Sequence, residues 1–138
     1  MPLITSKEKI RKILQSSKSI AVVGISPEPS KPSYLVSEVV KRYGFKLFFV
    51  NPKYEGTVIL GERVYRTLLN IQEEIHIVNI FRRPGDVVFI AEEAVKKGFK
   101  TFWFQPQTLN KDISRRLSEN GYNVVKDYCL KTACIELL

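Results

Sequence analysis

The sequence is poor in side chains that bind metals or form cross-links, because its 138 residues include only one histidine and two cysteines. Cys129 and Cys134 are five residues apart, and His76 is distant from both, so no spacing matches a zinc site or a redox Cys-x-x-Cys pair. On a helix the two thiols would point about 140° apart, and a disulfide between them is not expected. The chain is therefore expected to fold without a metal or a disulfide.

The sequence also lacks long hydrophobic runs and an excess of flexible residues. No apolar stretch approaches the roughly 18 residues that would cross a bilayer, and residues 1–18 are polar and charged, without a signal-peptide core. Seven glycines, seven prolines and 26% charged residues exclude collagen-like and disordered classes. We expect a single globular domain over residues 1–138, located in the cytoplasm and without a membrane partner.

Acidic residues are in the minority. The 22 lysines and arginines outnumber the 14 aspartates and glutamates, which gives a net charge of +8. An excess of this sign favours an anionic ligand or partner, without indicating which anion.

Apolar runs alternate with helical patterns along most of the chain. The runs predict five strands, at residues 19–24, 45–50, 75–81, 100–104 and 122–126. Helical spacing and capping residues predict helices at residues 6–16, 33–43, 84–97, 111–120 and 128–138. Residues 56–69 show no clear pattern. This alternation predicts an α/β fold, a Rossmann-like three-layer sandwich with a mainly parallel five-stranded sheet.

In such a sheet a ligand binds beyond the carboxyl ends of the strands. The loop after the first predicted strand contains Gly24, Ile25, Ser26, Lys31 and Ser33, and a helix follows directly. Backbone N–H groups and the positive end of a helix dipole suit phosphate. The loop has neither the GxGxxG nor the Walker pattern, so an ordinary connector rich in proline and serine remains the alternative.

The second predicted strand ends at Asn51, Pro52 and Lys53. Rossmann folds that select NAD place an acidic residue here to hold the ribose 2′-hydroxyl. A neutral residue followed by a cation suits a phosphorylated ribose instead, as in NADP or coenzyme A. The alternative is a simple turn, which Asn-Pro also favours.

Two further cations, Arg82 and Arg83, follow the third predicted strand. The planar guanidinium donates paired hydrogen bonds to phosphate, although two exposed arginines in a solvated loop are the alternative. Because Lys31 and Lys53 are expected at the same rim, the four cations together favour an anionic site.

Other chemically interesting residues are assigned structural roles. His76 lies within an apolar strand pattern, Trp103 is expected in the core, and Cys129 is expected to be a small buried hydrophobic residue, with a position near the ligand as the alternative. No nucleophile with an adjacent base, and no pair of carboxylates, can be assembled from the sequence. We therefore predict no catalytic and no metal-binding residues.

Six short motifs occur in a characteristic order. They are AVVGIS at 21–26, KPSY at 31–34, VNP at 50–52, LGERVY at 60–65, FRR at 81–83 and DYCLK at 127–131. Together they resemble the CoA-binding domain family, whose members are similar to the N-terminal domain of the succinyl-CoA synthetase α subunit. The resemblance covers residues 17–138 and implies a Rossmann-like fold that binds coenzyme A.

The resemblance also implies roles for particular residues. Those expected to bind the coenzyme are Gly24, Ile25, Ser26, Lys31 and Ser33 at the phosphates, Asn51, Pro52 and Lys53 near the adenosine, and Phe81, Arg82, Arg83 and Gln105 along the groove. The chain departs from the family pattern where Gln105 is followed by Pro106, and in the tail, which lacks a Glu-His pair.

No match to the phosphorylated histidine of the synthetases is present. We therefore expect a module that binds coenzyme A or an acyl-CoA rather than an enzyme, with a protein partner left open. The alternatives are an NADP-dependent oxidoreductase, which the missing glycine fingerprint disfavours, and a nucleic-acid-binding protein, which the scattered basic residues disfavour.

Overall fold

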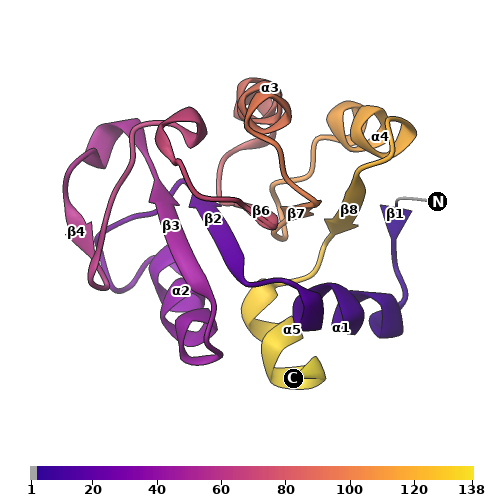
Figure 1. Ribbon diagram of the computed structural model, residues 1–138, viewed down its shortest axis with the longest axis horizontal. Helices are drawn as coiled ribbons and strands as arrows, with labels where there is room; N and C mark the ends of the chain where they lie inside the picture. The colour runs from indigo at the N-terminus through magenta and orange to yellow at the C-terminus, as the bar shows by residue number, and fades with distance from the viewer. Residues whose placement is uncertain (1–2) are drawn as a thin grey trace.

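A six-stranded parallel sheet organises the computed structural model, which describes residues 3–138 (Figure 1). The first two residues of the predicted domain lie outside the described part. The strands are β1 (Leu3–Ile4), β2 (Ser19–Val23), β3 (Lys46–Val50), β6 (Ile77–Ile80), β7 (Thr101–Phe104) and β8 (Asn123–Lys126). Their order across the sheet is β1-β8-β7-β6-β2-β3.

Five α-helices and three short 3-10 helices connect the strands. The α-helices are α1 (Lys7–Ser16), α2 (Pro32–Arg42), α3 (Val87–Lys97), α4 (Lys111–Glu119) and α5 (Leu130–Leu137). The 3-10 helices are η1 (Pro52–Tyr54), η2 (Leu68–Asn70) and η3 (Pro84–Asp86). The Rossmann-like α/β architecture predicted from the alternating pattern is confirmed, and no helix of residues 3–138 is long and apolar enough to span a membrane.

The predicted number of five strands is wrong, because the sheet has a sixth. Strand β1 pairs in parallel with β8, with Leu3 opposite Val124. A strand of two residues has no alternation to detect, so only the tertiary pairing defines it. The segment that showed no pattern contains a small antiparallel hairpin of β4 (Val58–Ile59) and β5 (Glu62–Arg63), followed by η2.

The sheet is buried on both faces by separate groups of helices. Helices α1, α2 and α5 cover one face, and α3 and α4 cover the other (Figure 1). All five residues of β2 are buried, which explains why the strand reads as one continuous apolar run. At the start of α1 the Ser6 hydroxyl accepts a hydrogen bond from the Lys9 N–H at 3.4 Å, so the predicted helix is present.

The connections reverse direction across the sheet beside β2. The chain passes from β2 to its neighbour β3 on one side, then crosses back to β6 on the other side. The strands β3, β2, β6, β7 and β8 thus follow the doubly wound order in which ligands bind where the direction reverses. That point is the pair of carboxyl ends of β2 and β6.

The single tryptophan provides a test of the packing. Trp103 is fully buried, and its Nε1 donates to the Tyr128 carbonyl oxygen at 2.6 Å. Replacing Trp103 with Phe should lower the free energy of unfolding by about 1–3 kcal/mol, because the partly buried carbonyl loses its donor and the smaller ring fills less of the core. Urea denaturation followed by circular dichroism measures this, with Phe89→Leu, at 67% exposure, as the control. Equal stability of the two variants would contradict the proposed contribution of this contact.

Candidate functional site

The carboxyl ends of β2 and β6 approach each other closely at Gly24. Gly24 has a φ of +97°, and a Cβ on this residue would lie 2.8 Å from the Phe81 carbonyl oxygen and 2.9 Å from Cδ of Arg82. The Gly24 N–H donates to the Val50 carbonyl oxygen at 2.9 Å, so the glycine also joins the end of β3. Only glycine fits both this conformation and this contact.

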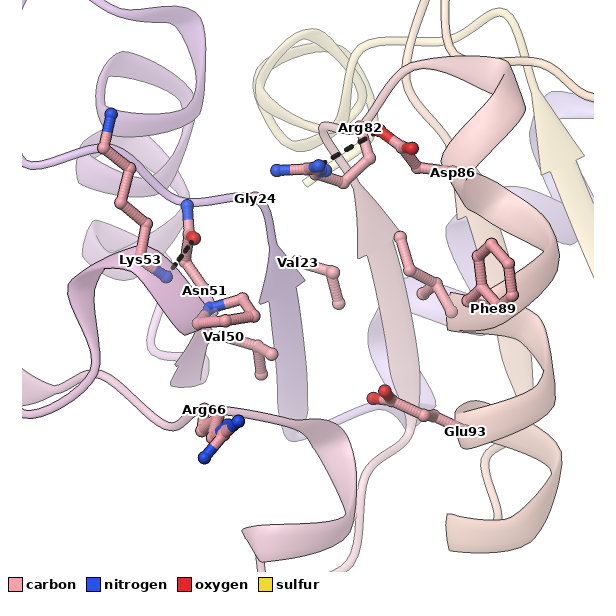
Figure 2. Close-up of a pocket in the computed structure, with 12 residues that line it drawn as sticks. Val23, Gly24, Val50, Asn51, Lys53, Arg66, Arg82, Asp86, Phe89 and Glu93 are labelled. Atoms are coloured by element: carbon pink, nitrogen blue, oxygen red, sulfur yellow. Dashed lines mark hydrogen bonds and ion pairs between the residues drawn. The ribbon is translucent and has the colours of Figure 1, made fainter.

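A cavity of about 390 Å³ opens on the α3 side of this crossing (Figure 2). Its walls come from the ends of β2 and β3, the chain before η2, and α3. The lining residues are Val23, Gly24, Val50, Asn51, Pro52, Lys53, Arg66, Arg82, Asp86, Phe89, Ile90 and Glu93. We call this the first cavity. It combines apolar side chains with three cations, a mixture that suits a flat, partly apolar anion.

The cations of the first cavity differ in how they are paired. Arg82 donates to Asp86 Oδ2 at 3.0 Å. Lys53 and Arg66 form no ion pair within residues 3–138, and Glu93 is engaged in accepting a hydrogen bond from the Leu68 N–H at 3.2 Å. Two positive charges in the first cavity therefore have no anionic partner in the described part of the chain.

A second cavity, of about 490 Å³, opens on the opposite face of the sheet. It lies between α2, the loop after β7 and the start of α5. The lining residues are Pro32, Val36, Phe81, Arg82, Arg83, Gln105, Pro106, Gln107, Thr108 and Cys129. Arg82 lines both cavities. The two cavities therefore flank one crossing, with Arg82 between them.

Gln105 connects the second cavity to α5. Its side chain is 4% exposed, and its Oε1 accepts a hydrogen bond from the Leu130 N–H at 2.8 Å. Its own carbonyl oxygen accepts from the Thr108 hydroxyl at 2.7 Å, which holds the loop that contains Pro106. These bonds position the first turn of α5 against the cavity.

Cys129 precedes that first turn and lines the second cavity, so it is half-buried and not the buried hydrophobic residue expected from the sequence. Burial alone would raise the pKa of its thiol, but hydrogen bonds outweigh burial and hold the pKa below its ordinary value. The donors are the backbone N–H groups of Thr132 and Lys131 and the side chains of Gln105 and Thr132. Cys134 is also free, and burial together with the charge of Cys129 raises its pKa to about 11.

Most polar groups of the loop after β2 bind one another. Ser33 Oγ accepts from the Ser26 N–H at 3.0 Å, and Ser26 Oγ accepts from the Glu28 N–H at 3.2 Å. Ile25 is fully buried in the core, and Lys31 lies 3.9 Å from Glu28 and lines neither cavity. The loop is thus a folded support for the start of α2.

Asn51 also holds the two strand ends together. Its Nδ2 donates to the Ile25 carbonyl oxygen at 2.8 Å, and its Oδ1 accepts from the Lys53 N–H at 3.0 Å. Pro52 and Lys53 line the first cavity beside it. Both polar atoms of the Asn51 side chain are therefore used within the protein, and the neighbouring lysine carries the free charge.

Sequence reasoning missed Arg66 and Phe89, which the structure brings to the first cavity. Arg66 lies in the segment that showed no pattern. Phe89 is 67% exposed on α3, and an aromatic residue on the outer face of a helix was the one available signal. His76 lines neither cavity, and its Nδ1 accepts a hydrogen bond from the Lys18 N–H at 2.8 Å.

The fold and the crevice at the β2–β6 crossing define a Rossmann-like domain. The chain belongs to the CoA-binding domain family, which matches residues 18–134. Membership supports binding of coenzyme A in general. No cluster of three metal-ligating side chains is found among the described residues.

Relatives of known sequence and structure agree with this assignment. An uncharacterized protein of Bacillus subtilis, YneT, is 38% identical over 93% of both chains. The ADP-forming acetate–CoA ligase of Methanocaldococcus jannaschii is 30% identical over 64% of this chain, which matches only 12% of that enzyme. A Thermus thermophilus structure has a TM-score of 0.93 at 28% identity, covering 97% of this chain and all of that one. A hypothetical protein from Pyrococcus horikoshii has a TM-score of 0.91 at 35% identity, covering 96% and 92%.

The crossing at Gly24 generates a stability test with a matched control. Gly24→Ala should destabilise the protein by more than Gly44→Ala, because both residues have φ above +90° but a Cβ on Gly44 meets nothing within 4 Å. We expect Gly44→Ala to cost about 1 kcal/mol and Gly24→Ala at least about 1 kcal/mol more. Denaturant midpoints of both variants measure the difference, and equal midpoints would show that the close contact costs nothing.

Proposed function

We propose that the protein binds coenzyme A or an acyl-CoA across the β2–β6 crossing and acts as a binding module. The observation that carries the proposal is the pair of cavities that meet at Arg82, with unpaired cations on one side and a thiol on the other. Coenzyme A has a matching asymmetry, since a phosphorylated nucleotide and a thiol-bearing arm are joined by a diphosphate.

The first cavity suits the adenosine 3′-phosphate end. Phe89 and Ile90 provide an apolar wall for a base. Lys53 and Arg66 come from elements across the cavity from Phe89 (Figure 2). Lys53 Nζ also lies 5.4 Å from the centre of the Tyr54 ring. These cations supply the charge that a phosphorylated ribose requires.

The crossing itself suits the diphosphate. Gly24 lines the first cavity and Pro32, the first residue of α2, lines the second, and a helix N-terminus favours negative charge. Arg82, from the adjacent strand end, lines both cavities. The protein residues present therefore fit the charged middle of the coenzyme.

Binding and orientation are the roles that these residues support. Arg82 neutralises negative charge, Phe89 shields a base from water, and the second cavity receives the pantetheine arm between α2 and α5. The titratable residues described around the cavities are mostly held in ion pairs or hydrogen bonds within the chain, as Asp86 and Glu93 are. A store or carrier of the coenzyme follows from this arrangement.

Removing the central guanidinium tests the proposal. Arg82→Ala should weaken coenzyme A binding by about 1.5–3 kcal/mol, because a charge-assisted hydrogen bond to phosphate is lost. The control is Arg115→Ala on α4, which removes the same charge from a residue that lines neither cavity. Titration calorimetry compares them. Equal affinities would place the coenzyme elsewhere.

The unpaired cations generate a prediction about specificity. The protein should prefer coenzyme A to dephospho-coenzyme A and to NAD, and Lys53→Ala combined with Arg66→Ala should remove most of this preference. Each contact to a phosphate contributes on the order of 1–2 kcal/mol. Competition binding with the three ligands measures it. A wild-type protein that binds all three equally would contradict this placement of the 3′-phosphate.

A further inference from the structure

The second cavity contains a cysteine whose surroundings favour the thiolate. Cys129 is the N-cap residue of α5, and contacts with the first turn and with Gln105 outweigh burial and hold the pKa of its thiol below the ordinary value. The thiolate is the nucleophilic form of cysteine, and the N-terminus of a helix favours it. Cys129 is also half-buried and lines the cavity, so a reagent that enters the cavity meets the sulfur.

An independent observation on the same side of the sheet also indicates a ligand. Asn79 of β6 is 1% exposed, and neither polar atom of its side chain has a partner among the described residues. The same holds for the hydroxyl of Ser37 in α2. Asn79 lies two residues before Phe81 on the strand, so both side chains face the same side of the sheet, where Phe81 lines the second cavity. Asn79 and Ser37 are themselves buried behind the lining of that cavity.

Unpaired polar atoms in a core are costly, on the order of 1–3 kcal/mol each. The pantetheine arm of coenzyme A carries two amide groups, which have the kinds of donor and acceptor that such unpaired atoms require. Strand β6 and helix α2, on the side of the sheet where the second cavity opens, therefore each carry an unpaired polar group. Such groups suit an arm that contains amides and ends in a thiol.

We propose that Cys129 forms a mixed disulfide with the thiol end of coenzyme A in the second cavity, so that the site stores the coenzyme covalently under oxidising conditions. This inference rests on the proposed function. Cys134 takes no part, because it is fully buried in the same helix and its pKa is raised to about 11.

The step is a thiol–disulfide exchange whose oxidised reactant is the disulfide of coenzyme A. The Cys129 thiolate attacks one sulfur of that disulfide, and a bond forms between Sγ and this sulfur. The sulfur–sulfur bond of the reagent breaks, and the second coenzyme A leaves as a thiolate that takes up a proton from solvent. Any reducing thiol reverses the reaction and releases the stored coenzyme.

Intact-mass spectrometry of the full chain tests the proposal. After incubation with the disulfide of coenzyme A, one adduct should appear, heavier by one coenzyme A less two hydrogen atoms. Cys129→Ser should abolish the adduct, and the matched variant Cys134→Ala should retain it. The initial rate should saturate with reagent concentration and exceed the rate with hydroxyethyl disulfide on the order of a hundredfold, because binding raises the local concentration.

Calorimetry on the same proteins separates this inference from the proposed function. If coenzyme A binds but no adduct forms at Cys129, the redox role is wrong and the binding function stands. If neither binding nor an adduct is observed, both are wrong. If Cys129 reacts as fast with hydroxyethyl disulfide as with the disulfide of coenzyme A, and neither rate saturates with reagent concentration, Cys129 is an ordinary reactive thiol. That result would overturn the proposal.

Asn79→Leu tests where the arm lies. The variant should bind coenzyme A roughly tenfold more weakly, through the loss of hydrogen bonds to the arm, and bind adenosine 3′,5′-bisphosphate, which lacks the arm, with unchanged affinity. An unchanged affinity for both ligands would overturn the placement of the arm beside Asn79.

Discussion

The close contact between the ends of β2 and β6 is the constraint on which the crevice depends. Gly24 lies against the backbone of Phe81, and its N–H also binds the end of β3, so three strand ends are held together by one residue without a side chain. Asn51 reinforces the same junction from β3. The cavities lie on either side of this junction, so its position sets where the loops and helices that line them meet the sheet.

The central strands were predictable because parallel strands buried on both faces read as continuous apolar runs. The positions of Gly24, Pro52, Lys53 and Arg82 at one rim followed from the topology once the strands were assigned. The hairpin of β4 and β5 and the edge strand β1 were not predictable, because two-residue strands carry no periodic signal. Their existence depends on pairing with neighbours that the local sequence does not specify.

The same reasoning separates predicted from missed side chains at the crevice. Residues directly after a strand end are placed by the sheet, whereas Arg66 and Phe89 arrive from segments whose positions depend on tertiary packing. The roles of polar side chains were harder to predict than their locations. Ser33 and Asn51 lie where expected, but their polar atoms bind the backbone of adjacent loops. A sequence cannot show whether a hydroxyl or an amide is already satisfied within the fold.

The position of Arg82 between the cavities has a consequence for the binding energy of a long ligand that fills both. Arg82 lines both cavities, and the partner of its guanidinium is Asp86. A fragment that drew this side chain toward one cavity would change what the other cavity offers. Contributions from the two halves of a long ligand are therefore not additive, and the affinity of the whole molecule differs from the sum expected from its separate pieces.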